Sequence, residues 1–259
     1  MSIVADHMAA WLRQQVEAAD AKGIVVGLSG GVDSAVVARV AQLAMGDAVL
    51  GVIMPAHSDP RDEQDARLVA ERFKLPVVAV DLSAAYDDLL SIIEQALTNQ
   101  SSGDRAAAGA PPRLALANLK PRLRMTTLYS VANRFSYIVA GTGNRSEIAI
   151  GYYTKYGDGG VDVLPLGALV KSEVYALARE LDVPSGILAK VPSAGLWRGQ
   201  TDEGEMGFTY AELEHFLREG PAAIAPAVAS KIESLVRASE HKRLMPPVFE
   251  PVRSEYVLG

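Results

Sequence analysis

The sequence contains no cysteine among its 259 residues. This absence excludes disulfide bonds, zinc sites built on thiolates and every mechanism that uses a thiol nucleophile. A chain without disulfides is compatible with a reducing compartment, and we expect a cytoplasmic protein.

Long hydrophobic runs and an excess of basic residues are also missing. No uncharged apolar stretch approaches the ~18 residues that a membrane-spanning helix needs, and the amphipathic start of the chain lacks the features of a signal peptide. The formal net charge is −6, whereas binding to nucleic acid usually needs a basic surface. We therefore expect neither a membrane nor a nucleic acid as partner, and 49% apolar residues suffice for a globular core.

Apolar runs alternate with helical patterns over the first 150 residues. The expected strands cover residues 23–28, 48–54, 76–82 and 135–141, and the expected helices cover 32–45, 60–74, 84–98 and 115–134. Asp59 is the expected N-cap of the second of these helices, with Pro60 at its first position. Such alternation predicts an α/β fold, a doubly wound, Rossmann-like parallel sheet with helices on both faces.

The rest of the chain follows a different rhythm. We expect helices at 172–181, 209–218 and 222–240, and a loop over 191–207. Residues 99–113, rich in Gly, Ser, Ala and Pro, predict a mobile surface loop. No linker divides the sequence, so we expect one domain over residues 1–259.

The stretch "SGGVDS" (29–34) joins the first expected strand to the helix after it. It is no Walker A loop, because no lysine lies between Lys22 and Lys74, and its glycine spacing is not that of a dinucleotide fingerprint. Backbone N–H groups, the helix N-terminus and the Ser34 hydroxyl suit a phosphate or pyrophosphate, and Asp33 suits a metal ion. The alternative is a tight turn with a capped helix and no ligand.

Several motifs resemble known families. "SGGVDS" resembles the loop of the PP-loop ATP pyrophosphatases, which cleave ATP between its α- and β-phosphates. "GTGNRSEIAIGYYTKYGDGGVDVLPLGALVKSEVY" (141–175) is similar to the NAD synthetases of that group, as are "NLKPRLRM" (118–125), "PSAGLWRGQTDEGEMGFTY" (192–210) and "HKR" (241–243). The resemblance implies ammonia-dependent NAD synthesis, in which ATP adenylates the carboxylate of deamido-NAD and ammonia displaces AMP.

The resemblance also implies the site residues. Those expected to bind ATP are Gly27, Leu28, Ser29, Gly30, Gly31, Val32, Asp33, Ser34, Thr142, Lys171 and Ser193. Those expected to bind deamido-NAD are Arg122, Lys155, Asp162, His241 and Lys242. Asp33 and Glu147 are expected to hold Mg²⁺. The pattern agrees, because both acids follow strand ends that meet at one edge of a parallel sheet, although Glu147 alone reads as a helix-starting glutamate.

The nitrogen source follows from composition. Glutamine-using synthetases commonly release ammonia with a cysteine nucleophile in an added domain, and this chain has neither cysteine nor spare length for a glutaminase domain. Free ammonia is therefore the expected donor, taken up directly or supplied by a separate protein. No residue is singled out as a catalytic base. The segments 195–207 and 55–61 suit a lid that shields the acyl-adenylate, and the resemblance implies a homodimer with the substrate site near the interface.

Three other functions remain open at this point. A PP-loop enzyme acting on tRNA is disfavoured by the acidic balance and by the missing cysteine. A GMP-synthetase-like or asparagine-synthetase-like enzyme would lack the 141–175 pattern. A nucleotide-binding module without activity is disfavoured because Asp33, Glu147 and Lys171 are all present.

Overall fold

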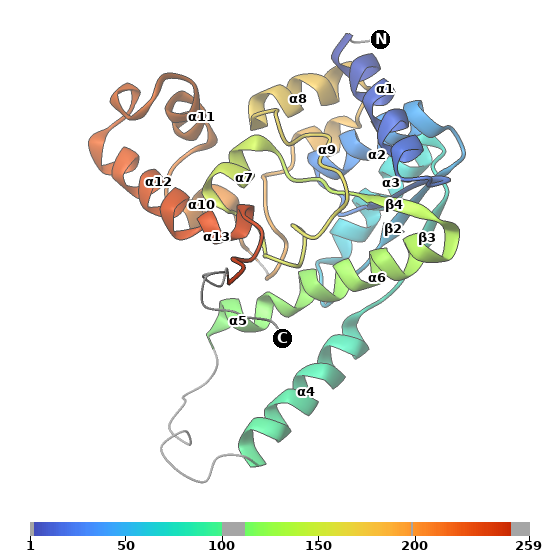
Figure 1. The fold of residues 1–259 in the computed structure, drawn as a ribbon, viewed down its shortest axis with the longest axis horizontal. Helices are drawn as coiled ribbons and strands as arrows, with labels where there is room; N and C mark the ends of the chain where they lie inside the picture. The colour runs from blue at the N-terminus through green and yellow to red at the C-terminus, as the bar shows by residue number, and fades with distance from the viewer. Residues whose placement is uncertain (1–2, 100–111, 198, 250–259) are drawn as a thin grey trace, which may run out of the picture.

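The computed structural model describes residues 3–99, 112–197 and 199–249 (Figure 1). The greater part of the predicted 99–113 loop therefore lies outside the described residues. At its two ends Asn99 closes helix α4 and Arg113 opens helix α5. Within the described ranges, no helix has both the length and the apolar character needed to cross a bilayer.

A four-stranded parallel sheet forms the centre of the molecule. Its strands are β1 (Gly23–Gly27), β2 (Val49–Ile53), β3 (Val77–Ala79) and β4 (Tyr137–Ala140), in the order β3-β2-β1-β4. Ile24 of β1 pairs with Val49 on one side and with Ile138 on the other. The chain thus leaves β1 in one direction and returns on its other side with β4. In such sheets ligands bind where the strand order reverses, here between the carboxyl ends of β1 and β4.

Helices cover both faces of the sheet, so the predicted doubly wound α/β fold is confirmed (Figure 1). One face packs against α1 (Ile3–Ala18), α2 (Val32–Met45), α3 (Pro60–Phe73) and α8 (Lys171–Glu180), and the other packs against α6 (Leu119–Phe135). Strand β1 alternates accordingly: Ile24 and Val26 belong to the first core, and Val25 to the second.

Two of the expected helix boundaries are confirmed. Helix α2 covers the predicted residues 32–45 and is buried on most sides because it lies between the sheet, α1 and α8. Helix α3 begins with Asp59 as N-cap, whose carboxylate accepts a hydrogen bond from the Arg61 N–H, and with Pro60 at the first position. Helix α4 (Ser83–Asn99) extends away from the body of the molecule (Figure 1).

The predicted helix 115–134 is wrong as a single element. It consists of α5 (Arg113–Ala117) and α6, which meet at Asn118. Pro121 explains the break, because proline has no N–H to donate to the carbonyl of Ala117 four residues earlier. Asn118 instead accepts a hydrogen bond from the Thr154 hydroxyl at 2.8 Å.

The carboxyl-terminal part packs around a core of its own. It contains α7 (Arg145–Ile150), α10 (Asp202–Met206), α11 (Tyr210–Glu219), the 3₁₀ turn η2 (Pro221–Ala223), α12 (Pro226–Ala238) and α13 (Glu240–Arg243). Ile150, Leu213 and Ile232 fill that core. The short helix α9 (Ser185–Leu188) instead packs beside α8 into the first core of the sheet. The predicted loop 191–207 is wrong over α10, and the predicted helix 222–240 begins only at Pro226 and ends at Ala238.

Candidate active site

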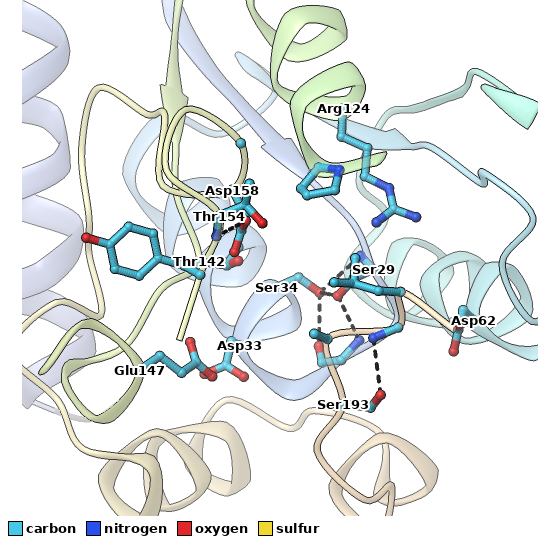
Figure 2. A pocket seen from close by; sticks show the side chains of 18 of the residues that line it. Ser29, Asp33, Ser34, Asp62, Arg124, Thr142, Glu147, Thr154, Asp158 and Ser193 are labelled. Carbon is cyan, nitrogen blue, oxygen red and sulfur yellow. Dashed lines mark hydrogen bonds between the residues drawn. The ribbon is translucent and has the colours of Figure 1, made fainter. Parts of the chain in front are cut away.

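The loop between β1 and α2 is held in shape by its own serine hydroxyls (Figure 2). The Ser34 hydroxyl donates to the carbonyl of Gly31 at 3.0 Å and accepts from the Ser29 N–H at 3.3 Å. The Gly31 N–H donates to the Ser29 hydroxyl at 3.2 Å. Gly31 is also the N-cap of α2, and its side-chain-free backbone leaves the start of that helix open. The loop is therefore preorganised at a helix N-terminus, where anions bind favourably.

Gly30 has a different role within the same loop. Its φ is +75°, and a Cβ atom there would lie 2.5 Å from the carbonyl oxygen of Asp62 and 2.7 Å from the Cβ of Asp65. Glycine is thus required for the close approach of the loop to helix α3.

Three charged side chains meet at the strand-order reversal. Asp33 comes from the first turn of α2, Glu147 from the first turn of α7, and Lys171 from the first position of α8. The Lys171 ammonium donates to Asp33 at 2.5 Å and to Glu147 at 3.2 Å. Figure 2 shows the two carboxyl groups close to each other. The predicted meeting of the two acids at one sheet edge agrees with this arrangement.

Asn144 fixes both carboxylates from the end of β4. Its amide group donates to Asp33 at 2.9 Å, and its side-chain oxygen caps α7 by accepting from the Glu147 N–H at 3.1 Å. Asn144 is fully buried. The Asp33 carboxylate is therefore positioned by a side chain that cannot move without breaking the helix cap, while the Glu147 carboxylate accepts from the Asn144 backbone N–H at 3.4 Å.

Burial dominates the electrostatics of this group. It raises the pKa of Glu147 to about 7, with added repulsion from Asp33 and Asp202, while Lys171 opposes the shift. Burial also disfavours the charged form of Lys171, but its pairing with Asp33 and Glu147 outweighs burial and raises the pKa of the ammonium. Lys171 therefore stays charged at neutral pH.

Two carboxylates that already bind one cation have the chemistry needed to bind Mg²⁺. Asp33 and Glu147 already share the Lys171 ammonium, and Mg²⁺ typically takes one or two carboxylates together with phosphate oxygens and waters. Among the described residues no group of three His, Asp or Glu side chains could hold a metal ion. A metal here would therefore depend on the phosphates of a bound nucleotide for its other ligands.

The group opens into a cavity of about 1200 Å³. Most residues that we predicted for the site line it: Gly27, Leu28, Ser29, Gly31, Val32, Asp33, Ser34, Arg122, Thr142, Glu147, Lys155, Lys171, Ser193, His241 and Lys242. Residues far apart in the sequence thus surround one space. Gly30 and Asp162 are not among the lining residues.

Asp162 lies beside the sheet with both carboxylate oxygens engaged. One accepts from the Tyr129 hydroxyl at 2.8 Å and the other from the Val139 N–H at 2.8 Å. Of the predicted pair His241 and Lys242, the lysine is also hydrogen-bonded within the protein. Its ammonium donates to the carbonyls of Gly151 and Tyr153, each at 2.6 Å. In this arrangement Lys242 joins two residues that line the cavity, whereas Asp162 holds α6 and β4 together.

The sequence did not single out three charged residues that line the cavity. Arg124 donates to the carbonyl of Met54 and to the Ser58 hydroxyl, both at 3.1 Å, and burial lowers its pKa. Asp158 accepts from the Thr154 N–H at 2.9 Å, and Asp202 opens helix α10. Asp158 and Asp202 stand inside the motifs "YGDGG" and "QTDE", and Arg124 follows Arg122 by two residues, so proximity to a recognised motif was the available signal.

The segment 191–201 is anchored at three points. At its start the Lys190 ammonium pairs with Asp62 at 2.8 Å and with Asp65 at 2.7 Å. In its middle the buried Lys120 donates to the carbonyl of Leu196 at 3.1 Å, and the Arg113 guanidinium lies 4.5 Å from the Trp197 ring. These contacts fasten the segment against α3, α5 and α6.

Comparison with known proteins gives consistent matches. The family model for NAD synthase matches residues 4–246. The chain is 49% identical to an NH(3)-dependent NAD(+) synthetase of Carboxydothermus hydrogenoformans, over 92% of this chain and 93% of that protein. Among solved structures it is similar to an NMN synthetase from Francisella tularensis (36% identity, TM-score 0.86, covering 96% of this chain and 97% of that one). An NH3-dependent NAD synthetase from Campylobacter jejuni matches at 26% identity and TM-score 0.75, over 96% and 100% of the two chains.

Proposed function

The chain belongs to the NAD synthase family, and we propose that it joins ammonia to the nicotinate carboxylate of deamido-NAD at the expense of ATP. The observation that carries this proposal is the meeting of Asp33, Glu147 and Lys171 beside the 29–34 loop. That group gives a polyphosphate binding position in a cavity that Lys155 and His241 also line.

The reaction needs an activated carboxylate. A carboxylate oxygen attacks the α-phosphorus of ATP, the bond to the β-phosphate oxygen breaks, and pyrophosphate leaves. The nitrogen of ammonia then attacks the acyl carbon, AMP leaves with the former carboxylate oxygen, and one proton is released as the amide forms. NAD, AMP and pyrophosphate are the products.

The residues of this chain contribute binding and charge. The N–H groups of the 29–34 loop and the N-terminus of α2 stabilise the leaving pyrophosphate. Lys171 supplies a permanent positive charge, and Ser193 supplies a hydroxyl from the opposite segment. Mg²⁺, held by Asp33 and Glu147, would neutralise further phosphate charge when bound. Arg122, Lys155 and His241 are our candidates for the pyridine nucleotide.

An isotope experiment tests the acyl-adenylate. Deamido-NAD labelled with ¹⁸O in its nicotinate carboxylate is converted with ATP, Mg²⁺ and ammonium, and the AMP is analysed by mass spectrometry. We expect one ¹⁸O atom in each AMP formed, because the carboxylate oxygen remains on phosphorus. Label found only in pyrophosphate or phosphate would mean that another phosphorus is attacked.

The Francisella match favours a second candidate substrate. That protein is an NMN synthetase. The corresponding substrate for this chain is nicotinate mononucleotide, which lacks the AMP half of deamido-NAD. The two substrates are distinguished by their kcat/KM values under equal ATP and ammonium. A higher value for deamido-NAD supports the main proposal, and a higher value for the mononucleotide replaces it.

We further propose that the protein is a homodimer. Helix α4 carries the exposed apolar side chains Ile92, Ile93 and Leu97, and Leu114 is exposed near the start of α5. Clustered exposed apolar residues are typical of protein interfaces. Light scattering coupled to gel filtration would give twice the 27.5 kDa of one chain, whereas the mass of a single chain would contradict this proposal.

A further inference from the structure

One buried carboxylate of the cavity has an oxygen without a partner. Asp202 is 3% exposed and lines the cavity. Its Oδ2 atom accepts from the Tyr210 hydroxyl at 2.8 Å. Its Oδ1 atom is buried and has no hydrogen-bond partner among the described residues. Leaving a buried charged oxygen unpaired is costly, so such an atom points to a ligand that supplies a donor.

A second carboxylate, Glu205, belongs to the same wall of the cavity as Asp202. The Tyr152 hydroxyl donates to Glu205 at 2.8 Å, and the Gln200 amide donates to the same carboxylate oxygen at 2.7 Å. Burial, together with the nearby Asp202 and Glu205 carboxylates, raises the pKa of Tyr152. Tyr152, Gln200 and Glu205 all line the cavity. This wall suits a small cation that only donates hydrogen bonds.

A divalent metal fits this position less well than a monovalent cation. Asp202 reaches Glu147 only through the Tyr210 hydroxyl, which lies 3.4 Å from the Glu147 carboxylate. The two acids therefore do not share one cation, and no trio of described His, Asp or Glu residues could hold a metal. Ammonium has four N–H donors and no acceptor, which matches an unpaired carboxylate oxygen.

The location also suits the second substrate of the proposed reaction. Tyr210 connects Asp202 to the Glu147 carboxylate, and the Tyr152 N–H donates to the Glu147 carbonyl at 2.9 Å, so this wall adjoins the carboxylate pair. Adenylation joins the substrate carboxylate to the α-phosphate, so the acyl carbon lies beside the phosphate position. Ammonium bound there would give one proton to the Asp202 carboxylate, and the ammonia so formed is close to the acyl carbon that it must attack.

We propose that Asp202 Oδ1 binds the ammonium ion from which the amide nitrogen is taken, on the wall formed with Tyr152 and Glu205. This inference rests on the proposed function and names the site of its nitrogen substrate. Ammonia is mostly protonated at neutral pH, so an enzyme that uses it from solution gains from a site for the cation.

The test uses Asp202→Asn, which removes the charge and keeps an oxygen for the Tyr210 hydroxyl. We expect the KM for ammonium to rise about 10- to 100-fold, as for a lost charged hydrogen bond. The KM values for ATP and deamido-NAD, and ATP–pyrophosphate exchange without ammonium, should stay within about twofold. An unchanged KM for ammonium, or an equal loss in all these quantities, would overturn the assignment.

Glu214→Gln is the matched control. Glu214 is also a buried carboxylate, but its oxygens accept from the Ser172 N–H at 2.8 Å and from the Ser172 hydroxyl at 2.5 Å, and it lies outside the cavity. We expect it to lower stability without a selective rise in the KM for ammonium. If the KM for ammonium also rose selectively in Glu214→Gln, the loss of any buried carboxylate charge would explain the result for Asp202→Asn. That outcome would overturn the proposal.

A binding measurement on the wild-type protein does not depend on a variant that folds. Ammonium chloride should raise the Tm above the value in equal concentrations of sodium or tetramethylammonium chloride, because only ammonium fits and donates. Equal Tm values in the three salts would overturn the site. Failure of the proposed function is recognised separately: wild-type protein would then form no amide from deamido-NAD at any ammonium concentration.

Discussion

Lys171 determines the charge balance of the site at the scale of single residues. Its side chain is 5% exposed, and its ammonium is shared by two carboxylates. A buried charge cluster of this kind contributes little net stability when intact, but it becomes strongly unfavourable when one partner is removed. Its proposed role with the phosphates of ATP would use the same ammonium that pairs with Asp33 and Glu147.

Lys171→Met should lower the free energy of unfolding by about 3 kcal/mol or more, because two largely buried carboxylates lose their cation. Mg²⁺ should raise the Tm of this variant more than that of the wild type by replacing the lost charge. Lys190→Met is the control, since Lys190 pairs with Asp62 and Asp65 at a half-exposed position and should cost about 1 kcal/mol or less. Equal losses in the two variants would contradict the account.

Glu147 should make stability depend on pH. Its folded pKa of about 7 lies above the ordinary value of 4.5, so the folded state holds the proton more tightly. The associated stability is present below pH 4.5 and is lost as the pH rises to about 7. Relative to wild type, Glu147→Gln should therefore become more stable between pH 5 and pH 8, by up to about 3 kcal/mol. Urea unfolding without metal at both pH values measures this, and a pH-independent difference would refute it.

At the scale of elements, the 29–34 loop depends on its contact with helix α3. Gly30 brings the loop against the backbone of Asp62, while Gly31 caps α2 with a φ of −97° that any residue can adopt. Two adjacent glycines thus serve different purposes, one for packing and one for an open helix start.

Gly30→Ala should destabilise the protein by about 1–3 kcal/mol, because the new Cβ meets backbone and φ is positive. It should also raise the KM for ATP as the loop is pushed away from α3. Gly31→Ala should cost less than about 1 kcal/mol, since its Cβ would approach only the Ser29 hydroxyl, at 3.3 Å. Denaturant unfolding measures the loss in free energy of unfolding for each variant. Similar losses for Gly30→Ala and Gly31→Ala would contradict separate roles for the two glycines.

Local patterns predicted most elements but missed two kinds of detail. Residues 115–134 were predicted as one long helix, although Pro121 removes a donor and breaks it at Asn118. Helix α10 was predicted as loop because Gly and polar residues dominate 195–207, although Thr201 followed by Asp202 and Glu203 is a helix-start pattern. In both cases a single residue outweighed the composition of the stretch.

At the scale of the whole molecule, the cavity lies where the parallel sheet with its helices meets the carboxyl-terminal helices. The 29–34 loop and Arg124 come from the sheet side, while Asp202 and His241 come from the helical side. The segment 191–201 joins them, and Lys120 fastens its middle to α6. That residues 195–207 act as a lid stays a prediction from the sequence.

Chymotrypsin cleavage near Trp197 should become slower when ATP and deamido-NAD are bound, because closure buries the segment. Lys120→Met should be cut faster than wild type without ligands, since the bond to Leu196 is lost. Lys22→Met, at an exposed position before β1, should behave as wild type. Cleavage that ligands do not change would count against a lid.

The sequence could predict Asp33, Glu147 and Lys171 as site residues, but it could not predict every residue that lies near them. Asp33 and Glu147 follow strand ends, so topology alone brings them together. Asp202 lies on helix α10, whose position depends on the carboxyl-terminal core. No local sequence pattern reveals that its Oδ1 atom lacks a hydrogen-bond partner. Asp162 illustrates the reverse, because its motif is recognisable but its oxygens bond Tyr129 and Val139.

The central claim is amidation of deamido-NAD with free ammonium as the nitrogen source. The most direct measurement is NAD formation by the purified protein from deamido-NAD, ATP and Mg²⁺, with ammonium in one reaction and glutamine in another. We predict NAD, AMP and pyrophosphate in equal amounts with ammonium and little NAD with glutamine, because the chain has no cysteine to release ammonia. Equal rates with glutamine, or no NAD with ammonium, would contradict the account.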